Sequence, residues 1–237
     1  MTLNAEQRKL NRLRLKQHTH EDYMLDIRLG TMPWLFDFEV HRGVFRPEVS
    51  SGIEFAKYLA EKPDLYMGKN VLDMCCGTGI DGIVMGKRGS GRAKQIAFSD
   101  ISEEAVKNAF ANSMRHGLLE RARFYQGDLF EGIPIDENYD LIVCNHPFLA
   151  GKPNRNVSVS RSWLDDGELI HRFLNYAKTV LSGQGMIVMP FSDIAGTVNH
   201  PGIQGERHGY KVWKSESLPI QFDEGFGSKF SVYHLIR

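Results

Sequence analysis

The stretch from Val71 to Asp81 constrains the fold of this 237-residue chain more than any other segment. Strand-forming apolar residues lead to the acid Asp73, a turn of small residues with Gly77 and Gly79 follows, and apolar spacing typical of a helix comes next. Glycine accepts positive φ and lets a ligand approach bare backbone, while the start of a helix presents unpaired N–H groups. The stretch therefore predicts a strand, a turn and a helix that suit a nucleotide-like ligand.

The turn alone is also compatible with a purely structural role, because it is not the G-x-G-x-x-G dinucleotide fingerprint. Its context favours a ligand. Residues 95–100 form a second expected strand that ends in Asp100, 27 residues after Asp73. A carboxylate at the end of the next strand can accept hydrogen bonds from both hydroxyls of a ribose. The expected ligand is thus a nucleoside.

Two further expected strands end in polar residues. Residues 122–130 close on Asp128, whose carboxylate can accept the exocyclic amine of adenine while Leu129 covers the ring; a loop or capping acid is the alternative. Residues 141–144 are a continuous apolar run typical of a central parallel strand, and Asn145 follows them. Because ligands bind outside the carboxyl ends of strands in open α/β sheets, these ends are expected to share one crevice.

Composition limits the class of protein. A hydrophobic content of 42% is enough for a sizeable core, and 29 basic against 29 acidic residues give no attraction of the whole chain to nucleic acid. No apolar run approaches the length of about 20 residues that spans a membrane, and no secretory signal is visible at the start. The three cysteines form neither a disulfide framework nor a metal-ligand pattern. We therefore expect a cytoplasmic protein without a metal site.

The N-terminal region, residues 1–43, is expected to be a helical extension and arm ahead of a domain at 44–237. It carries leucines among basic residues over 1–16, then a second candidate helix over 21–29, and alternating apolar residues around Gly43 that suggest a short hairpin or extended arm. The helices are interpreted either as a solvated cap packed on the main domain or as a basic face for RNA, the ribosome or another acidic partner.

Several residues outside the strand ends are candidates for substrate binding. Phe45 and Arg46 precede a helix expected to begin with a capping serine at 50 or 51, and they are placed to form a wall of the site. Phe191 follows a strand expected over 186–190, near the crevice expected at the carboxyl ends of the strands. The loop over 149–158 is either a substrate lid or a connection, and the histidines His200 and His208 are surface residues or, less simply, metal ligands.

The order of these motifs resembles the class I S-adenosylmethionine-dependent methyltransferases. The resemblance covers about residue 44 to the end, and it is greatest with the branch that has an Asn-Pro-Pro-Tyr/Phe motif. That branch comprises the release-factor and ribosomal-protein glutamine methyltransferases and the methyltransferases of exocyclic amines in DNA and RNA. The resemblance implies a doubly wound α/β fold with a mostly parallel seven-stranded sheet and S-adenosylmethionine as cofactor.

The resemblance also implies roles for individual residues. The expected cofactor-binding residues are Asp73, Cys75, Gly77, Gly79, Asp100, Ile101, Asp128, Leu129 and Asn145. The expected catalytic residues are Asn145, His146, Pro147 and Phe148, and the expected substrate-binding residues are Phe45, Arg46, Phe148 and Phe191. An amide nitrogen is a poor nucleophile, so acceptors for its two N–H bonds, the Asn145 side chain and a backbone carbonyl, would direct its lone pair at the methyl group.

Two residues depart from the family pattern. His146 replaces the first proline of the motif, and Cys75 replaces a glycine usual in the cofactor turn. His146 is expected either to act as a general base or substrate ligand, or to be a replacement that still supplies the needed carbonyl before Pro147. Because of these two departures, the resemblance is stronger support for the reaction class than for the identity of the methyl acceptor.

We therefore predict an S-adenosylmethionine-dependent N-methyltransferase that acts on an amide or amine nitrogen, with a protein glutamine as the first expectation. The alternatives are a small-molecule N- or O-methyltransferase, a methyltransferase of nucleic-acid amines, and a scaffold that keeps the cofactor fold without turnover. A nicotinamide dehydrogenase is a more distant alternative.

Overall fold

The computed structural model describes residues 3–30, 35–49, 51–87, 92–154, 158–222 and 226–237. The α-helices there are α1 (Ala5–Gln17), α2 (Gly52–Glu61), α3 (Ile80–Lys87), α4 (Glu103–Arg115), α5 (Glu168–Val180) and α6 (Pro201–Arg207). The strands there are β1 (Tyr23–Ile27), β2 (Leu35–Val40), β3 (Asn70–Met74), β4 (Gln95–Asp100), β5 (Ala122–Gln126), β6 (Tyr139–Cys144), β7 (Leu149–Ala150), β8 (Leu164–Asp165), β9 (Leu181–Ser192), β10 (Lys211–Phe222) and β11 (Phe226–Ile236).

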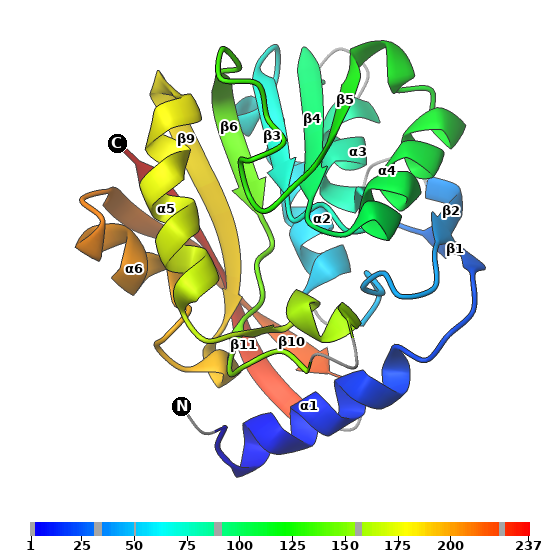
Figure 1. Ribbon diagram of the computed structural model, residues 1–237, viewed down its shortest axis with the longest axis vertical. Helices are drawn as coiled ribbons and strands as arrows, with labels where there is room; N and C mark the ends of the chain where they lie inside the picture. Colours follow the sequence, from blue (N-terminus) through cyan, green and yellow to red (C-terminus); the bar gives the residue numbers. More distant parts are fainter. Residues whose placement is uncertain (1–2, 31–34, 50, 88–91, 155–157, 223–225) are drawn as a thin grey trace.

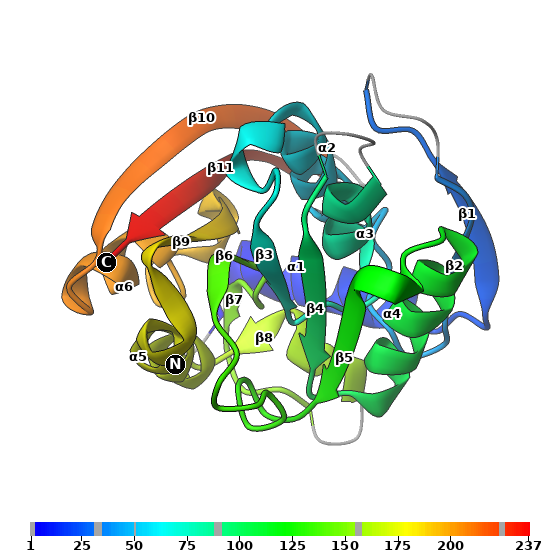
Figure 2. The same ribbon diagram turned by 90° about the horizontal axis from the view of Figure 1, so that it is seen from above.

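One sheet organises the molecule. Within the described ranges it has seven strands in the order β10-β11-β9-β6-β3-β4-β5. The run from β9 to β5 is parallel, whereas β11 is antiparallel to both β9 and β10. Helices α2 and α3 pack on one face of the sheet and α5 packs on the other, and Figure 2 shows α3 and α5 on opposite sides of it. The predicted doubly wound, mostly parallel seven-stranded sheet is confirmed.

Helices cover both faces of the sheet. Because side chains alternate along each strand, one strand contributes residues to the apolar core on each face. On β3, Val71 belongs to the apolar core beneath α2 and α3, while Leu72 and Met74 belong to the core beneath α5. Asp73 alternates with Leu72 and Met74, so it lies on the α3 side of the sheet. This direction matters for the site described below.

The N-terminal region combines one predicted helix with an unpredicted strand. Helix α1 is confirmed, and Asn4 caps it by accepting a hydrogen bond from the Gln7 N–H at 2.8 Å. The second helix expected over 21–29 is wrong, because Tyr23–Ile27 is strand β1, paired antiparallel with β2. The less exposed side chains of this strand alternate with exposed ones, among them Met24, and that is the period of a strand.

The two-stranded sheet of β1 and β2 is fastened to α4. The Asn112 side chain accepts a hydrogen bond from the Glu39 N–H at 2.7 Å and donates one to the Glu39 carbonyl at 2.8 Å. The hairpin that was expected around Gly43 is not formed, because β2 pairs with β1, the strand that precedes it in the chain. The expected arm also includes residues 31–34, which lie outside the described residues.

Other local expectations differ in detail. Ser102 caps α4 as predicted, by accepting a hydrogen bond from the Ala105 N–H at 3.3 Å. Ser51 occupies the capping position of α2 but its side chain makes no capping hydrogen bond, and Ser50 is outside the described residues. Helix α6 was not expected. Within the stretch interpreted as a lid, β7 pairs with β8, and residues 155–157 are not among those described.

The N-terminal helix crosses the carboxyl ends of the central strands, below β3 and β6 in Figure 1. The Trp163 indole N–H donates to the Asn11 side chain at 2.8 Å, and the Gln7 amide donates to the Ile194 carbonyl at 3.0 Å. Leu10 and Leu13 of α1 are buried in the core that includes Leu149 and Trp163. No helix of the described part is long and apolar enough to cross a bilayer.

Candidate functional site

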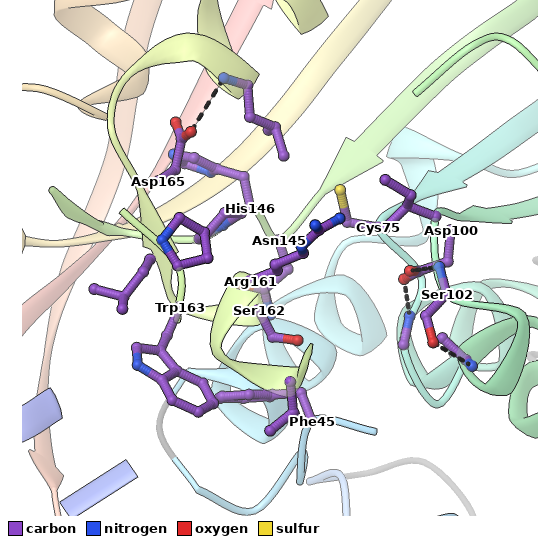
Figure 3. A pocket seen from close by; sticks show the side chains of 18 of the residues that line it. Phe45, Cys75, Asp100, Ser102, Asn145, His146, Arg161, Ser162, Trp163 and Asp165 are labelled. Carbon is purple, nitrogen blue, oxygen red and sulfur yellow. Dashed lines mark hydrogen bonds between the residues drawn. The ribbon is translucent and has the colours of Figure 1, made fainter. Parts of the chain in front are cut away.

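A cavity of about 840 Å³ lies where β3, β4 and β6 end. In Figure 3, Cys75 and Asp100 lie on one side, Phe45 and Trp163 on another, and Asn145 between the two groups. The predicted site residues that line the cavity are Phe45, Cys75, Gly77, Asp100, Ile101, Asp128, Leu129, Asn145, His146, Pro147 and Phe148. Its volume lies within the range of about 300–1,000 Å³ that small-molecule and cofactor sites occupy.

Asp100 is fixed at the end of β4 by backbone donors. Its carboxylate accepts hydrogen bonds from the Gly77 N–H at 3.1 Å and the Ser102 N–H at 2.9 Å, one on each oxygen. Burial nonetheless raises the pKa of Asp100, although these N–H groups oppose the shift. The carboxylate thus joins the glycine turn to α4 and presents acceptor lone pairs to the cavity.

The turn itself needs backbone conformations that L-residues rarely adopt. Cys75 has φ of 58° and Gly77 has φ of 52°. Added to Gly77, a Cβ would meet no atom nearer than 4.0 Å, so this glycine leaves open space beside bare backbone. Leu129, at φ of 56°, repeats the positive φ after β5. For the non-glycine residues Cys75 and Leu129 such a conformation costs about 1–3 kcal/mol, and such residues cluster at ligand sites.

Asp128 has a partner that the sequence did not reveal. Arg172 of α5 donates to its carboxylate at 2.9 Å, and both side chains are about one-third exposed. The pair is therefore screened by solvent and stabilises the fold only modestly. The ion pair uses one carboxylate oxygen of Asp128 and leaves the other outside it. The next residue, Leu129, is buried, and its carbonyl accepts a hydrogen bond from the Ser99 hydroxyl at 3.3 Å.

The segment after β6 brings four predicted catalytic residues to the cavity. Asn145 follows the buried Cys144 at the strand end and is half-buried. His146 is 2% exposed, and its Nε2 lies 2.7 Å from the Asn199 carbonyl, while its ring stacks on Phe191 with centroids 6.1 Å apart. Burial lowers the pKa of His146 to about 4, so the ring is neutral at pH 7.

An aromatic wall closes the side of the cavity nearest α1. The His18 and Phe45 rings stack with centroids 4.7 Å apart, and Trp163 lies 5.0 Å from His18. The Arg14 guanidinium lies over Phe45 at 5.7 Å from the ring centroid. Leu10 and Arg14 line the cavity, so helix α1 contributes directly to the site.

Four predicted site residues are not among those that line the cavity in the described structure. Gly79, at φ of 80°, allows close packing of α3 on α4, because an added Cβ would lie 2.9 Å from Ala109 Cβ. Phe191 is fully buried in the core, and the Arg46 guanidinium is held by Glu48, Tyr23 and the Gln17 carbonyl.

Asp73 is the fourth of these residues. It is 1% exposed, and its Oδ2 accepts the Gly82 N–H at 2.9 Å. Desolvation and the neighbouring Asp81 and Asp100 raise its pKa well above the ordinary value of a carboxyl. Asp73 therefore joins β3 to α3, as expected from its direction on the strand.

Among the contributors to the cavity that the sequence interpretation missed are Asp81, Trp163 and helix α1. Asp81 had a usable signal, because it is an acid directly after the glycine turn. Trp163 and α1 had none, since their place depends on contacts between distant segments. His200 and His208 lie elsewhere: His200 caps α6, His208 lies 2.9 Å from His171, and no group that could hold a metal ion occurs among the described residues.

The comparisons with known proteins agree with this geometry. The family model described as the methyltransferase small domain matches residues 37–196. The ribosomal protein uL3 glutamine methyltransferase of Bordetella pertussis is 31% identical over 130 residues, 51% of this chain and 43% of that protein. The release factor glutamine methyltransferase of Clostridium botulinum is 29% identical over 149 residues, 57% of this chain and 51% of that protein. The chain thus spans about half the length of these relatives or less.

A solved structure shows the same fold at low identity. The Thermus thermophilus 16S rRNA N2 G1207 methyltransferase, in complex with S-adenosylmethionine and guanosine, superposes with a TM-score of 0.63 at 17% identity. The superposition covers 92% of this chain and 51% of that one.

Proposed function

This chain belongs to the methyltransferase small domain family, and we propose that its cavity binds S-adenosylmethionine for methylation of a planar nitrogen, with a protein glutamine amide as the favoured acceptor. The observation that carries the proposal is that Asp100 and Asn145, the residues expected to bind the ribose and the acceptor nitrogen, line one cavity. Relatives at about 30% identity that are named glutamine methyltransferases support the choice of acceptor.

The residues present fit this cofactor. Asp100 offers carboxylate lone pairs suited to ribose hydroxyls, and the open space at Gly77 admits a ligand close to the backbone. Leu129 and Ile101 supply apolar surface for the adenine ring, with Asp128 beside them as an acceptor for its amine. When bound, S-adenosylmethionine supplies a methyl group on a sulfonium centre.

The chain's own residues would position the acceptor through hydrogen bonds and packing, and would form no covalent bond with it. The Asn145 side-chain oxygen would accept one N–H of an amide or amine, which directs the nitrogen lone pair and stabilises developing positive charge. Phe148 offers a ring face on which a planar group stacks. Phe45 and Trp163 exclude water from this side, which strengthens the polar contacts.

His146 is suited to holding this segment and not to taking a proton through Nε2. A carbonyl oxygen only accepts, so the 2.7 Å contact with Asn199 requires the hydrogen on Nε2. The lowered pKa keeps the ring neutral, so it adds no positive charge beside the acceptor. The sequence suggested that His146 acts either as a general base or substrate ligand, or as a replacement for proline that supplies a backbone carbonyl. The hydrogen bond to Asn199 favours the second role, because it keeps the backbone in place.

The charges around the cavity favour a protein acceptor over RNA. The exposed charged residues that line it among those described are two bases, Lys152 and Arg161, and two acids, Asp166 and Glu168. An RNA-binding edge is expected to be mainly basic, because affinity for nucleic acid comes largely from phosphate contacts. A rim of mixed charge suits a polypeptide.

Calorimetric titration with S-adenosylmethionine and, separately, NAD tests the cofactor. We expect saturable one-site binding of the former, weakened at least tenfold in Asp100→Ala because a charge-assisted contact is lost. Transfer of labelled methyl to glutamine-containing peptides, bulk RNA and small amines then tests the acceptor. Asn145→Ala should lower transfer about 100-fold with cofactor affinity retained, while the exposed Asn138→Ala should change neither.

The outcomes separate the alternatives. Labelling of RNA or of small amines in place of peptides would contradict the proposed acceptor. Binding without transfer, unchanged by Asn145→Ala, would indicate a scaffold. Absence of cofactor binding would overturn the proposed function.

A further inference from the structure

Asp81, in the first turn of α3, has a buried carboxylate in the cavity wall. It is 4% exposed, and its Oδ1 has no hydrogen-bond partner among the described residues. Buried carboxylate oxygens in folded proteins are nearly always paired, because an unpaired one loses its hydration without compensation. An oxygen left in this state beside a ligand cavity indicates that a ligand completes it.

The other two acids at this turn already have partners. Asp73 accepts the Gly82 N–H on its Oδ2 and does not line the cavity, and Asp100 accepts an N–H on each of its oxygens. Of these three carboxylates, Asp81 alone combines a place in the cavity wall with an oxygen that lacks a donor. The ligand group that pairs with this Asp81 oxygen is therefore a hydrogen-bond donor.

The electrostatics favour a cationic ligand group. Burial raises the pKa of Asp81 to about 8, and that of Asp73 is raised well above its ordinary value by burial and by the charge of Asp81. Neither carboxylate forms an ion pair within the described ranges. Without a counter-ion the protonated forms of both carboxyls are favoured, and a positively charged ligand group would restore the ionised form.

The ligand cation is organic rather than a metal ion. No cluster of His, Cys, Asp or Glu in the described part of the chain could hold a metal. An ammonium group carries one positive charge and N–H donors, which matches one unpaired carboxylate oxygen.

We propose that Asp81, and not the motif acid Asp73, binds the ammonium group of the methionine part of the cofactor. The inference rests on the proposed function, since it takes S-adenosylmethionine as the ligand. The Asp81 carboxylate accepts an N–H of the ammonium, and Asp73 keeps its structural bond to α3. Asp81 thereby distinguishes a nucleoside that carries an ammonium group from one that does not.

Three ligands that differ in their charged groups isolate the contribution of the ammonium group to the binding affinity. S-adenosylhomocysteine carries an ammonium and a carboxylate, 5′-(3-aminopropylthio)adenosine carries the ammonium alone, and methylthioadenosine carries neither. Calorimetry with wild type, Asp81→Asn, Asp73→Asn and the exposed Asp64→Asn measures each affinity. We expect Asp81→Asn to weaken the first two ligands about 10- to 100-fold and methylthioadenosine less than threefold, because a charge-assisted bond is lost.

The design separates failure of the inference from failure of the proposed function. If wild type binds none of the three ligands, the proposed function fails. If wild type binds S-adenosylhomocysteine and Asp81→Asn binds it equally well, or if Asp73→Asn alone loses the preference for the ammonium, the assignment to Asp81 is wrong. Asp64→Asn should match wild type, and near-ultraviolet circular dichroism checks that each variant is folded.

Discussion

The imidazole Nε2 of His146 lies 2.7 Å from the main-chain oxygen of Asn199, although the two residues are far apart in sequence. The Asn199 amide donates in turn to the Phe148 carbonyl at 3.3 Å and to the Asp165 carbonyl at 2.9 Å. Asn199 therefore holds the residues on both sides of Pro147. It is a positioning residue for Asn145, which precedes them.

Replacing Asn199 should impair turnover more than cofactor binding. Asn199→Ala removes the amide donors but keeps the main-chain bond to His146, so the segment loosens without losing its place. We expect kcat to fall about 10- to 100-fold, since small displacements of positioning groups cost that much, with affinity for S-adenosylhomocysteine changed less than threefold. Asn175→Ala on the exposed face of α5 is the control, and equal kcat in both variants would contradict this role.

Substitutions of His146 test whether it holds the segment or transfers a proton. His146→Gln places an amide donor near the position of Nε2, whereas His146→Ala leaves the Asn199 carbonyl unpaired. We expect the Gln variant to retain most of kcat and the Ala variant to lose about 10- to 100-fold. A pH–rate profile of wild type should show no limb near 6.5 that vanishes in His146→Gln. Such a limb would instead support a general base.

Acid should destabilise the protein through His18 as well as His146. Burial lowers the pKa of His18 to about 4, and its Nδ1 donates to the Arg14 carbonyl while Nε2 accepts the Arg46 N–H. The unfolded chain binds a proton near pH 6.5 and the folded chain only near 4, so stability falls as pH falls through this window.

Urea unfolding at pH 7 and pH 5 measures this loss. The free energy of unfolding should fall by about 1–2 kcal/mol for each such histidine. His18→Asn should show a smaller loss than wild type, because one of the buried rings with a lowered pKa is gone, whereas the exposed His171→Asn should match wild type. Comparing variants cancels the opposite contribution of the buried acids. Identical losses in wild type and His18→Asn would contradict the prediction.

The tight approach of α3 and α4 should make Gly79 sensitive to substitution. A Cβ there would lie 2.9 Å from Ala109 Cβ and 3.1 Å from Ala109 Cα, whereas at Gly68, with a similar positive φ, it would meet nothing within 4 Å. Both alanine variants carry the strain of positive φ, of about 1–2 kcal/mol, but only Gly79→Ala adds overpacking of about 1–3 kcal/mol.

Urea unfolding of the two variants isolates the steric contribution. We expect Gly79→Ala to lose about 2 kcal/mol more than Gly68→Ala. Equal losses would show that α3 and α4 separate without cost and that the glycine is present only for its φ.

The strands and their polar ends could be predicted from local pattern. The strand at Gln95–Asp100 and residues 141–144 of β6 follow from short apolar runs bounded by turns, which depend on residues adjacent in sequence. The error at Tyr23–Ile27 arose because a short amphipathic stretch is ambiguous between helix and strand. Its partner β2 decided the outcome.

The site was predictable only up to the point where side-chain direction matters. Asp100, Asn145 and Phe148 reach the cavity because they follow strand ends that the sheet brings together. Arg46 and Phe191 do not line it, since one is held by Glu48 and the other is packed in the core. Neither partner is visible in a linear motif.

The sequence by itself determined the order of the parallel strands and their connecting helices from β3 to β9, the glycine turn and the acids at the strand ends, because these depend on local periodicity and backbone conformation. Only the tertiary structure decided that Asp73 points to α3 while Asp81 lines the cavity, and that α1 closes the site through the bond from Trp163 to Asn11. The physical reason is that burial and hydrogen-bond partners come from segments far apart in the chain, so no local pattern encodes them.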